Sequence, residues 1–346
     1  MKRFLIIAVI VASPQFIFAQ YEASKKINRT YEVSGKGSLE VIGKYGDVHI
    51  DTWDANTVEL KVVIEVKKRS EEQAKEMLEK VSIAINDFDK NALSFRTNID
   101  GSFNNKSGEK MKIEYWIKAP KTLAYKIKNS YGNFYIDDNV GDNNFKISYG
   151  NIKAEKCQGK TVLKLSYGNG EVGGLGESQL EINYSNITLG DIKKTTIENN
   201  YSNINAENIN SVSIENRYGN LKTKSVNSIK GSSKYGNVTI SKLYKEIDFN
   251  GGIKVNWISK NFEKIRIEAK YGAIDLNFEK GFGAFITAEM TYCTLRMGDI
   301  PFDYSHIREK AQQSYYKGIV GDKSAAANRT ITITSAYGNA KLRFAD

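Results

Sequence analysis

The histidines and cysteines are the residues best suited to bind a metal or to attack a substrate, and the sequence holds few of either. Its two histidines are His49 and His306, and neither has a second His or Cys at the spacing of a zinc site. Its two cysteines are Cys157 and Cys293, which we interpret as small core residues rather than nucleophiles. We therefore expect no metal and no cofactor.

Carboxylates are the other catalytic candidates, because glycan cleavage needs two or three acidic groups close together. The acids that strand alternation turns outward are spread singly among Lys and Ser: Glu155, Glu171, Glu181, Glu198, Glu215, Glu268 and Asp275. We expect no catalytic residues and therefore no enzyme. A carbohydrate-active enzyme, similar to a polysaccharide lyase or hydrolase, stays open as the alternative.

A tyrosine-centred repeat positions most of these residues. Tyr-Gly-Asn or Tyr-Ser-Asn recurs every 17 or 18 residues. The tyrosines are Tyr131, Tyr149, Tyr167, Tyr184, Tyr201, Tyr218 and Tyr235, and the asparagines are Asn133, Asn151, Asn169, Asn186, Asn203, Asn220 and Asn237. Apolar residues alternate before each tyrosine, as at Leu163 and Leu165, and resume one residue out of phase after the asparagine. A straight strand would change faces there, so we expect a bend at Gly-Asn, where left-handed backbone angles are tolerated.

A third inward position follows eight residues after the tyrosine, at Cys157, Leu175, Ile192, Ile209, Val226 and Leu243, with Val140 nine residues after. Strand, bend, strand and apolar turn together make one rung of a solenoid. The sequence therefore predicts an all-β fold, a single-chain parallel β-helix with rungs of about 17 residues over residues 125–298. A chain of antiparallel hairpins is the alternative.

Stacked rungs would place equivalent residues about 4.8 Å apart. The tyrosines and the asparagines would then form two structural ladders along the axis, with hydrogen bonds between asparagine side chains. We expect the tyrosines to form a partly buried corner stack rather than a platform for sugars, because they share phase with buried Val and Ile. Cys157 and Cys293 would lie roughly 35 Å apart, whereas a disulfide needs Cα atoms within about 7 Å.

The two ends of the chain depart from the repeat. Residues 20–124 are the expected N-terminal α+β cap, with the first strands and one helix that begins at a capping box of Ser70 and Gln73. Residues 299–328 are an expected insertion, with a short helix up to about Gln313. Residues 329–346 return to the pattern as the final rung or C-terminal cap.

The first residues indicate export. A basic start, Met1-Lys2-Arg3, and an apolar run over residues 4–18 predict a signal peptide at residues 1–19. The run is short for a membrane span and contains Pro14, so we expect no stable transmembrane anchor. The net charge of +10 is scattered among alternating Lys and Glu. We therefore expect no nucleic-acid partner, and we place the protein in the periplasm, at the cell surface or outside the cell.

Three sets of motifs carry a resemblance to a known family. They are Tyr45-Gly46-Asp47-Val48 with Trp53, the segment Tyr115-Trp116-Ile117-Lys118-Ala119-Pro120, and the Tyr-Gly-Asn series. Over about residues 30–345 the chain resembles the putative-adhesin family of β-strand-repeat proteins, a domain of unknown function common in Bacteroidetes. The resemblance implies a β-strand-repeat architecture and brings no functional residues. We expect an exported, non-catalytic, adhesin-like interaction module whose partner, a cell-envelope polymer or a protein, is unknown.

Overall fold

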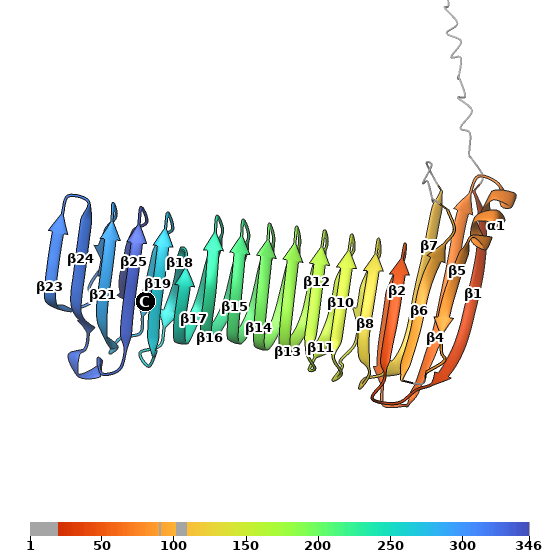
Figure 1. Cartoon of the computed structure of the whole chain (residues 1–346), viewed down its shortest axis with the longest axis horizontal. Coiled ribbons are helices and arrows are strands. Elements are labelled where there is room, and N and C mark those ends of the chain that lie inside the picture. Colours follow the sequence, from red (N-terminus) through yellow and green to blue (C-terminus); the bar gives the residue numbers. More distant parts are fainter. Residues whose placement is uncertain (1–19, 90, 102–108, 346) are drawn as a thin grey trace, which may run out of the picture.

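A computed structural model describes residues 20–89, 91–101 and 109–345. The described chain is all-β, with 26 strands joined in one open sheet. The strands stack into an elongated body, with helix α1 (Glu71–Glu79) near one end and strand β23 (Phe302–Lys310) at the other (Figure 1). The expected signal peptide, residues 1–19, lies outside the described residues. No helix in the described part of the chain is long and apolar enough to cross a membrane.

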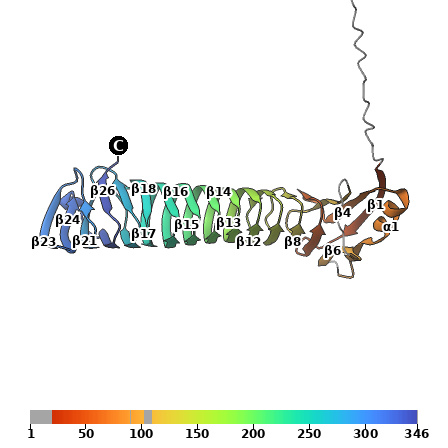
Figure 2. The same ribbon diagram turned by 90° about the horizontal axis from the view of Figure 1, so that it is seen from above.

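Consecutive repeats pair in parallel, with the register that the motif spacing predicts. In the middle of the chain each repeat is one long, curled strand (Figure 2), and residues 17 apart are partners, as in Asn203↔Asn220. These strands are β13 (Asn169–Asn183), β14 (Asn186–Asn200), β15 (Asn203–Arg217), β16 (Asn220–Lys234) and β17 (Asn237–Asn250). The antiparallel-hairpin alternative is therefore wrong for these repeats.

On both sides of this region a rung is divided between shorter strands. Before it lie β8 (Ala124–Ser130), β9 (Phe134–Ile136), β10 (Asn143–Ser148), β11 (Ile152–Cys157) and β12 (Thr161–Ser166). After it lie β18 (Ile253–Ile258), β19 (Lys264–Lys270) and β20 (Ile274–Phe278). Each of these strands pairs in parallel with the equivalent strand of the next rung.

The inward side chains of successive rungs form one continuous core. Ile187, Ile192 and Ile197 of β14 are each at most 3% exposed. One inward position differs from the sequence-based expectation, because Asn139 is buried where Val140 was expected, and Val140 is 41% exposed. Asn139 fits there since its Nδ2 donates to Cys157 Sγ (3.4 Å) and its Oδ1 accepts from Asn143 Nδ2 (2.7 Å).

The corner of each rung is made by the tyrosine itself. The expectation of left-handed angles at Gly-Asn is wrong, because Tyr149 has φ +56° and Gly150 does not have a positive φ. Glycine follows the tyrosine for a different reason. A Cβ on Gly150 would lie 1.9 Å from the carbonyl oxygen of Gly132 in the preceding rung. The glycine therefore permits the backbones of neighbouring rungs to approach each other at the corner.

The N-terminal part is both a first rung and a cap. Strands β2 (Ser38–Lys44) and β3 (Val48–Trp53) pair in parallel with β8 and β9. The cap adds antiparallel pairs among β1 (Tyr21–Glu32), β4 (Thr57–Lys68), β5 (Val81–Asn86), β6 (Ala92–Ile99) and β7 (Lys110–Pro120). Ser70 caps α1 by accepting the N–H of Gln73, and the helix buries Ala74 and Met77.

The C-terminal part does not run in sequence order. Strand β25 (Thr330–Ala336) lies between β19 and β21 (Gly283–Thr291), so residues 329–346 are not the final rung in space. Strand β26 (Ala340–Phe344) likewise lies between β20 and β22 (Leu295–Arg296). The expected short helix before Gln313 is wrong, because β23 and β24 (Gln313–Gly321) form an antiparallel hairpin that pairs with β21. A 3₁₀ turn at Lys323–Ala325 follows.

The inward and outward assignments predict unequal effects of two nearby substitutions. Ile209 is 2% exposed in the core, so Ile209→Ala should lower the free energy of unfolding by about 2–5 kcal/mol. Glu215 faces solvent on the same strand, so Glu215→Ala should change it by no more than about 0.5 kcal/mol. Chemical denaturation of both variants measures the difference. A larger effect at Glu215 would contradict the assignment of the whole repeat.

Candidate functional site

The repeat tyrosines form a continuous stack of rings along one edge of the molecule. Neighbouring ring centroids lie 4.8 to 5.4 Å apart, with interplanar angles of at most 18°. The stack runs through Tyr45, Tyr131, Tyr149, Tyr167, Tyr184, Tyr201, Tyr218 and Tyr235. Rings inside the stack are about half exposed, as for Tyr201 at 51%. All seven tyrosines of the predicted ladder are therefore brought together on a surface open to solvent.

A second, shorter stack continues the line towards the C-terminal end. Tyr271 stacks on Tyr337, and Tyr337 stacks on Tyr292, both at 5.1 Å. The ring of Tyr337 lies between the other two because β25 lies between β19 and β21. No ring contact joins Tyr235 to Tyr271 in the described part of the chain, so the column is interrupted there.

Stacking and backbone strain oppose each other at every corner. All the stacked tyrosines have φ between +50° and +66°, a region that costs a residue with a Cβ about 1–2 kcal/mol. Each ring pair contributes about 0.5–1.5 kcal/mol beyond the area that it buries. Each contact is shared by two tyrosines, so the stack supplies about one contact per residue, which offsets part of the cost of the left-handed backbone.

The predicted asparagine ladder lies beside the tyrosines and is exposed. From Asn151 onward, each side-chain Nδ2 donates to the Oδ1 of the asparagine one rung earlier, with distances from 2.8 to 3.4 Å. These bonds join all seven residues from Asn133 to Asn237. The ladder offers a regular row of amide groups at the surface.

A second amide row, which sequence analysis missed, lies inside the core below the corner. Asn199 Nδ2 donates to Asn216 Oδ1 (2.6 Å), and Asn216 Nδ2 donates to Ser233 Oγ (2.8 Å). Asn216 Nδ2 also donates to the Gly219 carbonyl (2.8 Å). The signal in the sequence is that Asn199 and Asn216 stand two positions before a repeat tyrosine, where several other repeats have an apolar residue. These side chains satisfy corner carbonyls that strand pairing leaves free.

The outward acids are not all spread singly, and this corrects the sequence-based expectation. Glu181, Glu198 and Glu215 are direct partners on consecutive rungs and form one line. Lys128, Lys146 and Lys164 continue the same line in the other direction. The two halves meet where Lys164 Nζ lies 2.6 Å from Glu181. The result is a charged column that is positive towards the N-terminal end and negative towards the C-terminal end.

This carboxylate line lacks the features of an acid catalyst. The hydrogen bond from Lys164 holds the pKa of Glu181 below its usual range, whereas a general acid needs a raised pKa. Glu198 and Glu215 are exposed on the face of the stack. Glu215 pairs with the neighbouring Arg217 at 3.2 Å. The arrangement presents charge to solvent.

His49 belongs to an aromatic cluster on the first rung. Its ring stacks on Trp116 at 3.9 Å and on Tyr135 at 4.6 Å. Burial lowers the pKa of His49, so the neutral imidazole predominates at pH 7. Ligand atoms of His49, Asp47 and Glu114 lie within 4.8 Å of one another, a grouping that sequence spacing could not predict because β3 and β7 meet only by pairing.

Both carboxylates of that three-residue grouping also contact other groups of the protein. Asp47 Oδ1 accepts the backbone N–H of Asn133 (2.7 Å), and Glu114 pairs with Lys112 at 2.8 Å. Both carboxylates therefore already have partners within the protein. The stacked imidazole acts as a packing group between two aromatic rings.

The other candidate residues lie apart from one another. His306 is exposed on β23, with its ring 5.7 Å from that of Tyr315. Cys157 and Cys293 are free thiols, as expected. Burial raises the pKa of Cys157 to about 11, which keeps the thiol protonated and unreactive at pH 7. The expectation that the two cysteines are not disulfide-bonded is therefore confirmed.

No family model matches the sequence, and no curated protein matches it. The chain is similar to solved structures described as putative adhesins, the resemblance that the motifs indicated. For one from Bacteroides fragilis the identity is 15%, the coverage 92% of this chain and 97% of that chain, and the TM-score 0.30. For one from Parabacteroides distasonis the identity is 16%, the coverage 75% of this chain and 93% of that chain, and the TM-score 0.34. Identities and TM-scores this low assign no site and no activity to this chain.

The left-handed backbone of the tyrosine column predicts an unusual order of stabilities. Tyr201→Ala removes two ring contacts and keeps the strain, so it should lower the free energy of unfolding by about 1–3 kcal/mol. Tyr201→Gly removes the same contacts but relieves the strain, so it should be more stable than Tyr201→Ala by up to about 1 kcal/mol. Urea denaturation ranks the two variants. If the glycine variant is the less stable, the tyrosine does not have a positive φ.

Proposed function

We propose that this protein is an exported, non-catalytic, adhesin-like interaction module, located in the periplasm or at the cell surface. Its repeat region would act as a parallel β-helix, a rigid rod that presents its side-chain columns to a polymer or protein of the cell envelope. The exposed tyrosine stack is the single observation that carries the proposal. The predicted signal peptide at residues 1–19 supports export.

The stack has the composition of a binding surface. Tyrosine is enriched among residues that dominate interface energies, because it combines apolar area with a polar tip. Rings about half exposed, such as Tyr167 at 50% and Tyr184 at 52%, form a contiguous apolar strip. The asparagine ladder borders this strip with polar groups. Apolar strips with polar rims mark interaction sites on soluble proteins.

The regular spacing suits a partner that is itself a repeat. Equivalent groups recur about every 4.8 Å along the axis, so one type of contact can be made many times on an extended chain. Contacts made in series on one rigid body raise the overall affinity well above that of a single contact. A cell-envelope polymer meets this requirement, and so does an extended protein segment.

A glycan-cleaving enzyme is the second candidate, favoured by the line of Glu181, Glu198 and Glu215. Adjacent carboxylates are the groups that such chemistry uses. Glu198 and Glu215 are exposed, and the lowered pKa of Glu181 suits an ion-pair role. The non-catalytic role is therefore the better supported of the two.

Binding to envelope material tests the proposal. Purified protein would be sedimented with isolated envelope polymer and with envelope protein fractions, and the bound fraction measured. The triple variant Tyr167→Asn, Tyr184→Asn and Tyr201→Asn removes three rings while keeping a residue type that tolerates left-handed angles. We expect it to lose at least about tenfold in affinity, equivalent to 1.4 kcal/mol.

The matched control is the triple variant Glu171→Gln, Thr188→Ala and Asn205→Ala, which changes one exposed column on the other leg of the rung. It should bind like the unchanged protein. An equal loss of affinity in both triple variants would show that the tyrosine stack is not the binding surface. Release of new reducing ends from the polymer, abolished by Glu198→Gln, would establish the enzyme instead.

A further inference from the structure

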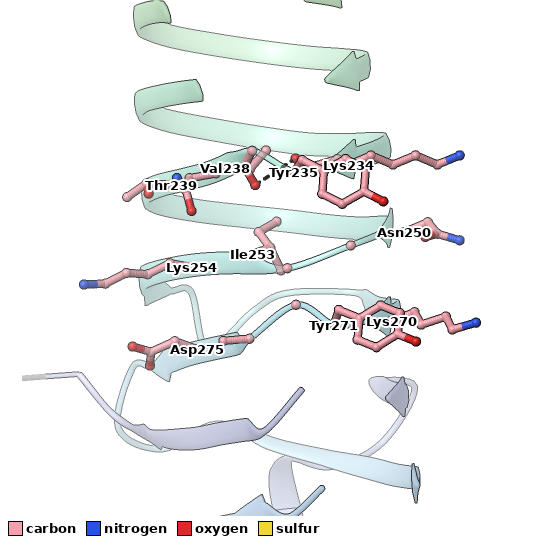
Figure 3. Close-up of a pocket in the computed structure, with 17 residues that line it drawn as sticks. Lys234, Tyr235, Val238, Thr239, Asn250, Ile253, Lys254, Lys270, Tyr271 and Asp275 are labelled. Carbon is pink, nitrogen blue, oxygen red and sulfur yellow. Dashed lines mark hydrogen bonds between the residues drawn. The ribbon is translucent and has the colours of Figure 1, made fainter. Parts of the chain in front are cut away.

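The interruption of the tyrosine column leaves a gap in the surface between Tyr235 and Tyr271. Tyr235 is 81% exposed and Tyr271 is 72% exposed, compared with 51% for Tyr218 inside the stack. Each of the two rings lacks a stacking neighbour on the side that faces the other. In Figure 3 the two rings lie on either side of the segment that contains Asn250 and Ile253.

A shortened corner creates this gap. Between the paired positions Ser232↔Asn250 and Thr239↔Lys254, the upper rung has six residues and the lower rung has three. Three residues are therefore missing from the lower corner, including its tyrosine. Gly251, with φ +132°, and Gly252 close the short turn in their place. The signal for the missing corner in the sequence is the separation of Tyr235 and Tyr271, which are 36 residues apart, about twice the repeat length.

The resulting notch has walls formed by Tyr235 and Tyr271 and a floor formed by Gly251 and Gly252. Its volume is about 980 Å³, which is within the range of small-molecule sites. Two rungs span about 10 Å, and stacked rings in this protein lie about 5 Å apart. One planar ring therefore fits between the two tyrosines with the spacing that the column itself uses.

The notch also leaves a backbone donor without its usual partner. The N–H of each tyrosine from Tyr131 to Tyr218 donates to a carbonyl of the next rung, as Tyr218 does to Lys234 at 3.0 Å. Among the described residues, Tyr235 has no such bond, because the corner that would supply the carbonyl is missing. A ligand in the notch can therefore accept a hydrogen bond from this N–H.

The charge at the rim is positive. Lys234 and Lys270 precede the two tyrosines, and their side chains extend on the same side as the rings (Figure 3). Of the nearby acids, Glu268 pairs with Arg266, and Asp275, which lines the notch on the side away from the two rings (Figure 3), pairs through Oδ2 with Arg343. Neither rim lysine forms an ion pair among the described residues. Two ammonium groups beside an aromatic sandwich favour an anionic substituent on the ring.

We propose that this notch is a binding site for a planar aromatic ring that bears an anionic group. The ring would stack between Tyr235 and Tyr271, and the anionic group would lie between Lys234 and Lys270. The source of such a ring is a free aromatic acid or an aromatic side chain flanked by acids in a partner protein. The notch would bind it whether or not the tyrosine stack binds a polymer.

Isothermal titration calorimetry with 4-hydroxyphenylacetate tests this site. We expect binding of one ligand per chain, weakened at least about tenfold for the neutral 4-hydroxyphenylacetamide, a loss of 1.4 kcal/mol or more. Cyclohexylacetate keeps the charge without the aromatic ring, and methyl glucuronide offers a sugar acid. Neither should bind detectably. Binding of either one as tightly as 4-hydroxyphenylacetate would overturn the proposal.

Three variants test whether the ligand binds in the notch. Inserting Lys-Tyr-Gly between Gly251 and Gly252 restores the missing corner, so a protein tyrosine should occupy the space and abolish binding. Circular dichroism and melting temperature would verify that this variant is folded. Lys234→Gln with Lys270→Gln should weaken binding at least about tenfold, whereas Lys222→Gln, at an exposed lysine of another column, should leave it unchanged. Undiminished binding by the insertion variant and by the double lysine variant would place the ligand elsewhere and contradict the proposal.

A titration with a peptide distinguishes the two sources of the aromatic ring. The peptide Asp-Tyr-Asp, acetylated and amidated at its ends, supplies an aromatic side chain flanked by acids. Tighter binding than that of 4-hydroxyphenylacetate supports a ring from a partner protein, and weaker binding supports a free aromatic acid. Absence of binding for both probes would overturn the proposal.

Discussion

The close approach of backbones at the tyrosine corner is the constraint on which the rest of the structure depends. A side chain at Gly150 would collide with the carbonyl oxygen of Gly132 at 1.9 Å. In the rungs where serine replaces the glycine, the hydroxyls of Ser185 and Ser202 instead accept N–H groups of the preceding rung. Both solutions keep the rungs in contact at this edge. Every corner then turns at the same place, and equivalent residues fall into line.

Alignment of the corners gives the molecule its surface. A tyrosine held at a positive φ points its ring away from the core, so rings that alternation alone would bury become half exposed. Their stacking offsets backbone strain, which links the stability of the rod to the surface that it presents. The asparagine ladder and the Lys–Glu column follow from the same register. The surface and the fold therefore depend on one repeated geometry.

The sequence predicted the period, the parallel register and the inward residues, because each of these repeats locally every 17 or 18 residues. It misplaced the left-handed residue, since a bulky side chain rarely adopts a positive φ and glycine was the natural candidate. Glu181, Glu198 and Glu215 follow one another at intervals of 17 residues, so the period alone predicts that they align. Their alignment was overlooked because the acids are far apart along the chain. The position of β25 between β19 and β21 depends on non-sequential pairing, which no local pattern encodes.

The notch shows how a deviation within one rung interrupts the tyrosine column while the buried core stays continuous. Three missing corner residues leave Ile253 and Val255 of β18 buried in the core, while one ring is removed from the column. The rung regains its length at its other turn, where five residues lie between Ile258 and Lys264 and only two between their partners Leu243 and Glu246. A site of this kind is possible because each rung contacts only its neighbours.

Amide hydrogen exchange measured residue by residue tests the corner geometry most directly. The N–H groups of Tyr149, Tyr184 and Tyr218 donate to the next rung at 3.0 Å, so they should exchange slowly, as expected for the interior of a stable stack. The N–H of Tyr235 has no such bond among the described residues and should exchange much faster. Equal protection at Tyr235, or fast exchange throughout the series, would contradict the account of the tyrosine corner.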